Sequence, residues 1–196
     1  MFMNTFVIAI FTCIISTIFV LSVAYSMSRM RFKMRKPFMN IAMIIGLFPS
    51  FMSMIAVYYI LRALNLADGA MIRVALIIVF SAGSGAGFYV AKGFFDTISK
   101  SLDEAAIIDG ATRWNVFTKI TVPLSKPIIV YTILTSFMGP WVDFIFGKVI
   151  CRADAQYYTV SIGLWKMLEK EYIDSWYTCF AAGAVVVSIP IAILFL

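Results

Sequence analysis

The polar residues that could do chemistry gather in one stretch, residues 94–126, between two long apolar runs. Within it Ser101 precedes Glu104 by three positions, the spacing of a capping box, in which a hydroxyl caps the first turn and a carboxylate bonds back to the capping amide. Gly110 can take the left-handed conformation that ends a helix, and Thr112 can cap a second helix. The pattern predicts a short helix whose small side chains allow another protein to come close, or a helix that lies on lipid headgroups.

Groups that could catalyse a reaction or hold a metal are scarce elsewhere. The sequence has no histidine, and Cys13, Cys151 and Cys179 lie far apart, so neither a metal site nor a disulfide framework is indicated. It also lacks the Gly-x-x-x-x-Gly-Lys-Ser/Thr loop that cradles nucleotide phosphates. We therefore expect no enzymatic activity and no cofactor in this chain, and any ATP and Mg²⁺ would be bound by another polypeptide.

The composition is that of a membrane protein. Hydrophobic residues make up 62% of the chain and charged residues only 13%, far from the balance of a soluble domain. The net charge of +6 does not indicate nucleic acid, because the basic residues lie in short links between apolar runs. A bilayer-crossing helix needs about 20 mostly apolar residues. The sequence predicts an all-α, polytopic membrane bundle with five spans, near residues 6–25, 38–61, 71–91, 128–146 and 177–196.

The distribution of Lys and Arg predicts the orientation of these spans. Five basic residues follow the first span, Arg29, Arg31, Lys33, Arg35 and Lys36. Five more mark the link after the third span, Lys92, Lys100, Arg113, Lys119 and Lys126. Because cytoplasmic loops are enriched in such residues, both links are predicted to be cytoplasmic. The N-terminus and residues 149–176 are then outside. The last apolar run reaches the final residue, and we expect a fragment trimmed at one or both ends.

A resemblance to a known family rests on the cytoplasmic link. Glu104-Ala105-Ala106, followed by Gly110, Ile120 and Pro123, resembles the EAA signature of ABC importer permeases. The one departure is Val122, where the signature has leucine. Asp109-Gly110-Ala111 and the Pro-Leu-Ser-Lys-Pro of residues 123–127 resemble the carbohydrate branch of that family, and Trp141-Val142-Asp143-Phe144 and residues 158–164 are similar to MalG-type subunits of maltose and malto-oligosaccharide importers.

The resemblance implies a fold and a mechanism. The fold would be that of a type I ABC importer permease, with about five of its six spans present here and the first one missing. The short helix would be the coupling helix, seated in a cleft of a cytoplasmic ATPase, so that closure of the ATPase subunits switches the sugar path between inward and outward access. The residues expected to make this contact are Glu104, Ala105, Ala106, Asp109 and Gly110.

Two further sets of candidate residues lie on the predicted outer side. Trp141 could stack on a sugar ring and Asp143 could bond sugar hydroxyls, or they could be an interfacial tryptophan and an acid at headgroup level. The second set mixes aromatic and charged residues. This second set consists of Glu169, Lys170, Glu171 and Tyr172. The segment is expected to be a solvated interfacial helix or, by resemblance, the contact for an external binding protein.

The predicted function is that of a transmembrane permease subunit in an ATP-driven, binding-protein-dependent sugar importer of the bacterial cytoplasmic membrane. Its cargo would be malto-oligosaccharides or another oligosaccharide such as a galacto-oligosaccharide. The implied partners are a second permease subunit in a heterodimer, two ATPase subunits, an extracytoplasmic sugar-binding protein and the lipid bilayer, with no nucleic acid. The rival interpretation is a structural membrane bundle without transport, which accounts for the spans but not for the signature.

Overall fold

The computed structural model describes residues 1–47, 50–152, 154–169 and 173–195, and these residues are helical or lie in turns and loops, without a strand. The elements follow one another as α1 (Phe2–Arg29), α2 (Arg35–Gly46), α3 (Ser50–Ala63), α4 (Met71–Gly83), η1 (Ser84–Gly87), α5 (Phe88–Thr97), α6 (Lys100–Ile108), α7 (Arg113–Val116), η2 (Phe117–Thr121), α8 (Val122–Leu124), α9 (Lys126–Val142), α10 (Ile145–Cys151), η3 (Ala155–Tyr157), α11 (Val160–Met167) and α12 (Ile173–Phe195). The predicted all-α class is confirmed.

Three helices in the described part of the chain are long and apolar enough to cross a bilayer: Phe2–Arg29, Met71–Thr97 and Asp174–Phe195. The second of them contains α4, the 3₁₀ turn η1 and α5. A fourth span results if Arg113–Leu124 and Lys126–Val142 are taken together, although these two helices meet at an angle of 81°. Three of the five predicted spans therefore coincide with helices of suitable length and composition, and the span predicted at residues 128–146 overlaps the second helix of the bent pair.

The second predicted span differs from the structure. Residues 38–61 were expected to form one helix, whereas the described residues form two shorter ones, α2 and α3. The first ends at Gly46, three positions before Pro49 in the sequence. A proline has no N–H to donate to the helix ladder and its ring clashes with the preceding turn, so a continuous helix through this stretch is disfavoured.

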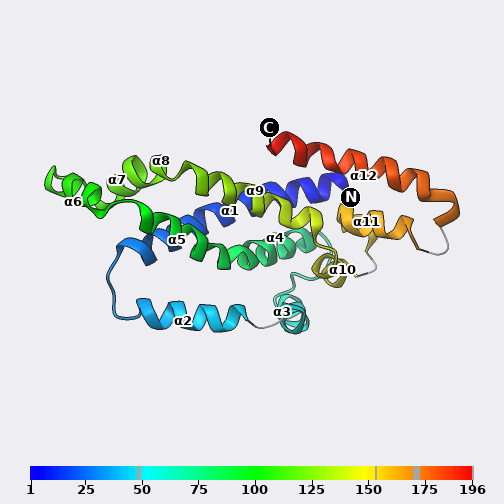
Figure 1. Ribbon diagram of the computed structural model, residues 1–196. Coiled ribbons are helices and arrows are strands. Elements are labelled where there is room, and N and C mark those ends of the chain that lie inside the picture. The colour runs from blue at the N-terminus through cyan, green and yellow to red at the C-terminus, as the bar shows by residue number, and fades with distance from the viewer. Residues whose placement is uncertain (48–49, 153, 170–172, 196) are drawn as a thin grey trace. The chain divides into compact units, whose positions relative to one another are not determined.

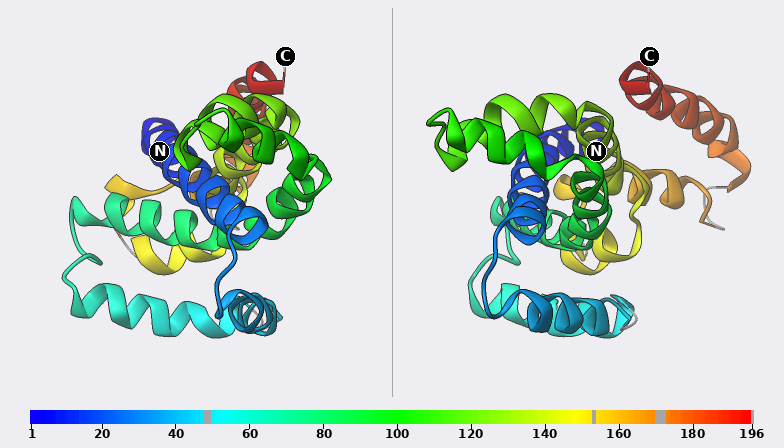
Figure 2. Two further views of the ribbon diagram at one scale, coloured as in Figure 1. Left: turned by 90° about the vertical axis from the view of Figure 1, so that its left-hand side faces the viewer. Right: turned by 60° about the vertical axis from the view of Figure 1, so that its left-hand side comes forward.

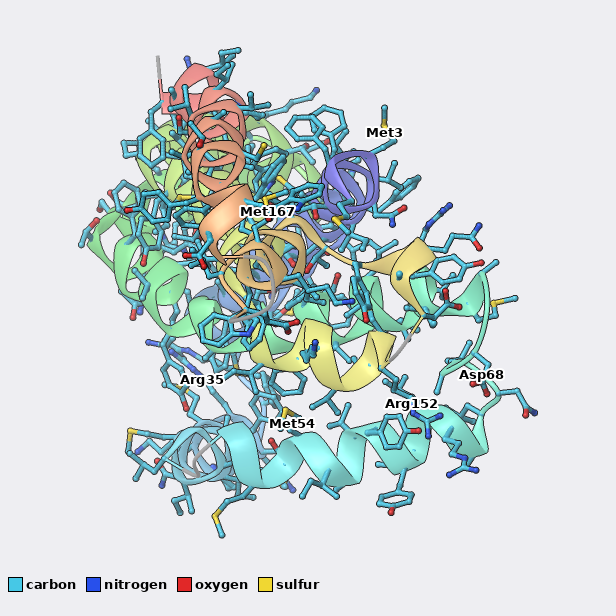
Figure 3. All side chains as sticks on the ribbon, turned by 90° about the vertical axis from the view of Figure 1, so that its right-hand side faces the viewer. Met3, Arg35, Met54, Asp68, Arg152 and Met167 are labelled. Carbon is cyan, nitrogen blue, oxygen red and sulfur yellow. The ribbon has the colours of Figure 1, made fainter. Side chains whose placement is uncertain are left out.

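The chain divides into two compact units. The first unit comprises Met1–Cys13, Pro49–Ala82 and Leu134–Leu196, and the second comprises Ile14–Phe48 and Gly83–Ile133. The core of the first unit contains Ile8, Leu76, Ile150 and Ile162, all at most 1% exposed. At the side of this unit Arg152 lies beside α3 (Figure 3), with its guanidinium 5.3 Å from the centre of the Tyr58 ring.

The second unit is built on the C-terminal part of α1. Val20 and Ala24 pack against Phe88 and Phe95 of α5, and Ile128 at the start of α9 completes this core. Within this unit α6 lies at one end and α7 runs back from it (Figure 1), as the right-hand view of Figure 2 also shows for the same green segment. Since lipid tails are as apolar as these side chains, such helices are held by close packing and by specific polar contacts.

Candidate functional site

The short helix α6 begins at Lys100, one residue earlier than its predicted cap. Ser99 is the capping residue: its hydroxyl accepts a hydrogen bond from the Ser101 amide at 3.3 Å. Ser101 lies inside the first turn and its hydroxyl lies 2.7 Å from that of Ser99. The predicted capping box from Ser101 to Glu104 is therefore wrong. Ser99 has the non-helical backbone that a cap requires, which places Asp103 in the first turn, where a negative charge stabilises the helix dipole.

The end of α6 follows the prediction. Gly110 has a φ of +86°, the left-handed conformation that glycine adopts without steric cost. Its amide donates to Ile107 O at 3.0 Å, and the Ala111 amide donates to Ala106 O at 2.9 Å. These two bonds are the pair that defines a Schellman motif. They reverse the chain sharply at the end of the helix.

The next helix starts directly after that turn. The Thr112 hydroxyl accepts from the Asn115 amide at 3.2 Å and so caps α7, as predicted. The helix continues as one π turn, η2, before α8 and the bend at Ser125. Pro123 lies in this last turn and cannot donate a backbone hydrogen bond, so the regular ladder is interrupted where the π turn ends.

Most of the surface of α6 is open. Glu104, Ala105, Asp109 and Gly110 are exposed, and Ala106 is partly exposed. Apolar side chains share this surface: Ile108 is 85% exposed. No residue of this helix is fully buried. An exposed apolar face beside charged residues is typical of a surface that another protein covers.

One arginine ties this exposed helix to the membrane helix α1. The Nε of Arg29 lies 3.1 Å from Asp103 Oδ2, and its Nη2 donates to Ile98 O at 2.9 Å. The two side chains are only 4% and 13% exposed. Next to this pair the Ser28 hydroxyl donates to Asp96 Oδ1 at 2.6 Å. Loss of one partner of a buried ion pair costs far more than loss of an exposed one, so this contact fixes the position of α6.

Sequence reasoning missed this connection. Arg29 was interpreted only as one of the basic residues that set the orientation, and Asp103 only as an acid near a helix dipole. Their positions differ by 74 residues, so no local pattern links them. A second long-range contact joins α1 to α7 and η2: the Tyr25 hydroxyl donates to Arg113 O at 3.4 Å, and its ring lies 4.7 Å from that of Phe117.

The predicted sugar residues lie in the first unit. Trp141 is 3% exposed and its ring centre lies 5.3 Å from that of Phe2 and 5.9 Å from that of Phe137. Because the indole is enclosed by these rings, the stacking on a sugar that we expected is not available in this arrangement. The indole Nε1 is buried and finds no hydrogen-bond partner in the described part of the chain.

Asp143 has a structural partner. Its Oδ1 accepts from the Gly147 amide at 3.0 Å and so caps the first turn of α10. Its backbone oxygen accepts from the Ser161 hydroxyl. The carboxylate is half-buried and accepts from the backbone of Phe146 as well as from that of Gly147.

The predicted contact for the external binding protein lies only in part within the described residues. Glu169 follows α11 and its amide donates to Lys166 O at 3.3 Å. Lys170, Glu171 and Tyr172 lie outside the described residues.

Comparisons with known proteins identify the family. The family model described as "Binding-protein-dependent transport system inner membrane component" matches residues 20–196. The galactooligosaccharides transport system permease protein GanQ of Bacillus subtilis (strain 168) is 34% identical over 196 residues, which are 100% of this chain and 68% of GanQ. The maltodextrin transport system permease protein MalD of Streptococcus pneumoniae (strain ATCC BAA-255 / R6) is 31% identical over 194 residues, 99% of this chain and 68% of MalD.

A comparison with solved structures supports the same family assignment. The crystal structure of a bacterial ABC transporter involved in the import of the acidic polysaccharide alginate contains a chain that is 26% identical, with a TM-score of 0.80 over 99% of this chain and 71% of that one. The resemblance to carbohydrate ABC importer permeases and the type I permease fold are thereby confirmed. These relatives are permease subunits and not enzymes. The chain belongs to the family of binding-protein-dependent transport system inner membrane components, the multi-pass permease subunits of ABC transporters in the cytoplasmic membrane.

Proposed function

We propose that this chain is a permease subunit of an ATP-driven importer whose cargo is an oligosaccharide, with malto-oligosaccharides and galacto-oligosaccharides as the two candidates. The names of the similar relatives support both candidates, at 31% and 34% identity. The working complex would contain a second permease subunit, two ATPase subunits that bind ATP and Mg²⁺, and an extracytoplasmic binding protein. The loop at residues 94–126 would face the cytoplasm.

The observation that carries the proposal is the combination of an exposed α6 with its buried tether. The exposed residues Glu104, Ala105 and Asp109 would contact the ATPase. The small side chain of Ala106 would allow the backbone of the ATPase to come close to α6. A movement imposed on α6 then passes through the ion pair of Arg29 and Asp103 into α1. Gly110 ends the helix in a conformation that fixes the direction of the next one.

For the sugar pathway we propose Trp141 and Asp143 in a revised form. The enclosed indole would act through its N–H, which is buried without a partner among the described residues, and not through its ring face. Asp143 would act through its half-buried carboxylate, which also accepts from the first turn of α10. The segment from Glu169 to Asp174 would contact the binding protein.

The coupling role is tested by Glu104→Gln in the complete transporter, reconstituted with its partners in vesicles. We expect sugar-stimulated ATP hydrolysis to fall by about tenfold or more, because one charge at the contact is removed from a partly desolvated interface. Asp68→Asn is the matched control, since it removes an exposed carboxylate from the first unit. Equal ATP hydrolysis in the two variants, at equal assembly, would contradict the proposal.

Two more measurements address the cargo and the binding protein. ATP hydrolysis across a panel of malto- and galacto-oligosaccharides separates the two candidates, and stimulation by neither class would rule out both. Deletion of residues 169–174 should weaken stimulation by the binding protein while leaving basal hydrolysis unchanged. Stimulation that survives this deletion would remove the segment from the proposed contact.

A further inference from the structure

The second unit contains a cavity of about 280 Å³ that is lined from three sides. Its walls are the end of α1 with the residues that follow it, the first turns of α6, and the start of α7. The lining cations are Arg29, Arg31, Arg35, Lys100 and Arg113. Two carboxylates, Asp103 and Glu104, also line it. Five positive and two negative groups leave a formal charge of +3 in a small volume.

Only part of this charge is neutralised within the described part of the chain. Asp103 is paired with Arg29. The other four cations form no ion pair with any described residue, and neither does Glu104. Among the described residues, Arg29 Nε and Nη1 and Asp103 Oδ1 are buried without a hydrogen-bond partner, although Nε lies within ion-pair distance of Asp103 Oδ2. Because a buried donor without a partner is unfavourable, the site is incomplete as the chain alone forms it.

The chemistry of the lining favours a phosphate group. Three of the four unpaired cations are arginines, whose planar guanidinium groups bind phosphate oxygens in a bidentate manner. A tetrahedral phosphate presents oxygens in several directions and can be reached from three walls at once, whereas a planar carboxylate has two oxygens. A basic pocket at the predicted cytoplasmic ends of membrane helices is also where anionic lipid headgroups bind.

We propose that this pocket binds a phosphate group, carried by an anionic phospholipid of the cytoplasmic leaflet or present as free phosphate. This goes beyond the proposed transport function and does not depend on the cargo. The bound phosphate joins the residues after α1 to α6 and α7, and so reinforces the tether of Arg29 and Asp103. Arg31 and Arg35 supply the charges that the tether itself does not use.

The sequence offers a matched pair of variants for the test. Arg31 and Arg35 line the pocket, whereas Lys33 and Lys36 alternate with them in residues 31–36, are exposed and do not line it. The double variants R31A/R35A and K33A/K36A lose the same charge from the same stretch. Unspecific attraction of these residues to an anionic surface therefore changes equally in both double variants.

The complete transporter in detergent is titrated with fluorescently labelled phosphatidylglycerol, and with labelled phosphatidylcholine for comparison. We expect the affinity for phosphatidylglycerol to fall at least tenfold in R31A/R35A and less than threefold in K33A/K36A. A competition arm with inorganic phosphate separates the sources: displacement at millimolar concentration shows that free phosphate suffices, and its absence assigns the site to the lipid. Either result supports the proposal.

Three outcomes would overturn it. Equal losses in the two double variants would leave only surface attraction. Equal binding of the two lipids, without binding of inorganic phosphate, would show that the pocket does not select an anionic headgroup, because phosphatidylcholine carries a phosphate but no net charge. Weaker association of the ATPase subunits in R31A/R35A, without a change in lipid or phosphate affinity, would assign the pocket to an acidic protein side chain. If R31A/R35A fails to assemble, Arg31→Ala alone serves, because this side chain is exposed and lies outside any helix; its expected loss is at least threefold.

Discussion

The two ends of α1 are anchored by different chemistry, each within its own unit. At the C-terminal end the contacts are charged: Arg29 pairs with Asp103, and Ser28 bonds to Asp96. At the N-terminal end they are neutral: Asn4 donates to Gln156 O at 2.7 Å, and the Thr5 hydroxyl accepts from the Val160 amide at 2.9 Å.

The elements that these anchors hold differ in burial. The anchored helix of the second unit, α6, contains no fully buried residue, whereas α11 in the first unit buries Val160, Ile162 and Gly163. The first unit therefore spreads its stability over many packed atoms. The second unit keeps α6 open for a partner and relies on a few strong polar contacts, so that the loss of one contact should do more harm there.

The largest expected effect is that of Arg29→Met. Removal of one partner from a buried ion pair costs about 3–5 kcal/mol, because the other charge stays buried without compensation. We expect amide hydrogen exchange in residues 99–110 to accelerate by about hundredfold or more, measured by mass spectrometry on the complete transporter. Lys33→Met is the control and should leave exchange unchanged.

A double variant sharpens this test. Replacement of both partners by apolar residues, as in R29M/D103L, is expected to recover most of the lost protection, because no unpaired charge remains. If R29M alone exchanges like the unmodified protein, the ion pair does not hold α6 and the contrast between the two units disappears.

The next effect concerns Cys151 in the first unit. This thiol is 1% exposed and donates to Tyr157 O at 3.3 Å. Burial raises the pKa of the thiol from 9.0 to about 12, and the negative charge of Asp154 makes a smaller contribution in the same direction. At pH 8 the thiolate fraction is then about a thousandfold lower than in the unfolded chain. We expect maleimide labelling of a C13A/C179A variant to be at least hundredfold slower in the folded transporter than after unfolding in detergent.

The direction of the pH dependence follows from the same pKa shift. Because the folded state favours the neutral thiol, the stability that this group contributes is fully present below pH 9 and is lost as the pH rises toward 12. Labelling should therefore accelerate as the pH is raised from 8 to 10. Folded and unfolded transporter that react at the same rate would show that this part of the first unit is open.

A smaller effect is expected for Thr5→Val. The valine has nearly the same shape but cannot accept the hydrogen bond from the Val160 amide, and an unsatisfied buried amide costs about 1–3 kcal/mol. The midpoint of thermal unfolding of the complex should fall by a few degrees. Thr5→Ser keeps the acceptor and should preserve that bond. If valine is tolerated better than serine, packing and not the hydrogen bond anchors this end of α1.

The smallest effect is that of Gly110→Val. A β-branched residue at a φ of +86° is strained, at a cost of about 1–2 kcal/mol. Gly110→Asn is the matched variant, because asparagine adopts the left-handed conformation more easily. We expect α6 to show faster hydrogen exchange in the valine variant than in the asparagine variant. Equal exchange in both would mean that the turn after α6 tolerates another conformation.

The local features of the candidate site were predictable from the sequence, and its long-range contacts were not. Gly110 and Thr112 follow from rules that depend on a few neighbouring residues, and the structure confirms both conformations. The cap was assigned to Ser101 because Glu104 follows it by three positions, whereas Ser99 satisfies only the general preference for serine at a helix cap. Because α6 begins directly after Ser99, Asp103 lies beside Arg29, and this contact depends on the packing of the whole second unit.

Trp141 illustrates the same limit. Its sequence neighbours indicate a helix kink and an acid close by, but nothing local predicts that Phe2 encloses its ring. The second predicted span differs from the structure for the opposite reason: hydropathy was averaged over residues 38–61, and such an average does not register that α2 ends at Gly46. Hydropathy predicts a membrane span well where every residue of the helix is subject to the same apolar environment, the lipid.

The π turn at Phe117–Thr121 has a consequence for how the length of this chain can vary. Deletion of one residue from a regular α-helix rotates everything beyond it by about 100°. A wide turn already holds one residue more than the regular ladder needs. A one-residue deletion there should therefore convert this turn to ordinary α-helix and leave the faces of α7 and α9 in register. The same deletion in the middle of α9 would rotate the C-terminal half of α9 away from its neighbours. Homologues that differ in length by one residue are thus expected to place the gap in this turn.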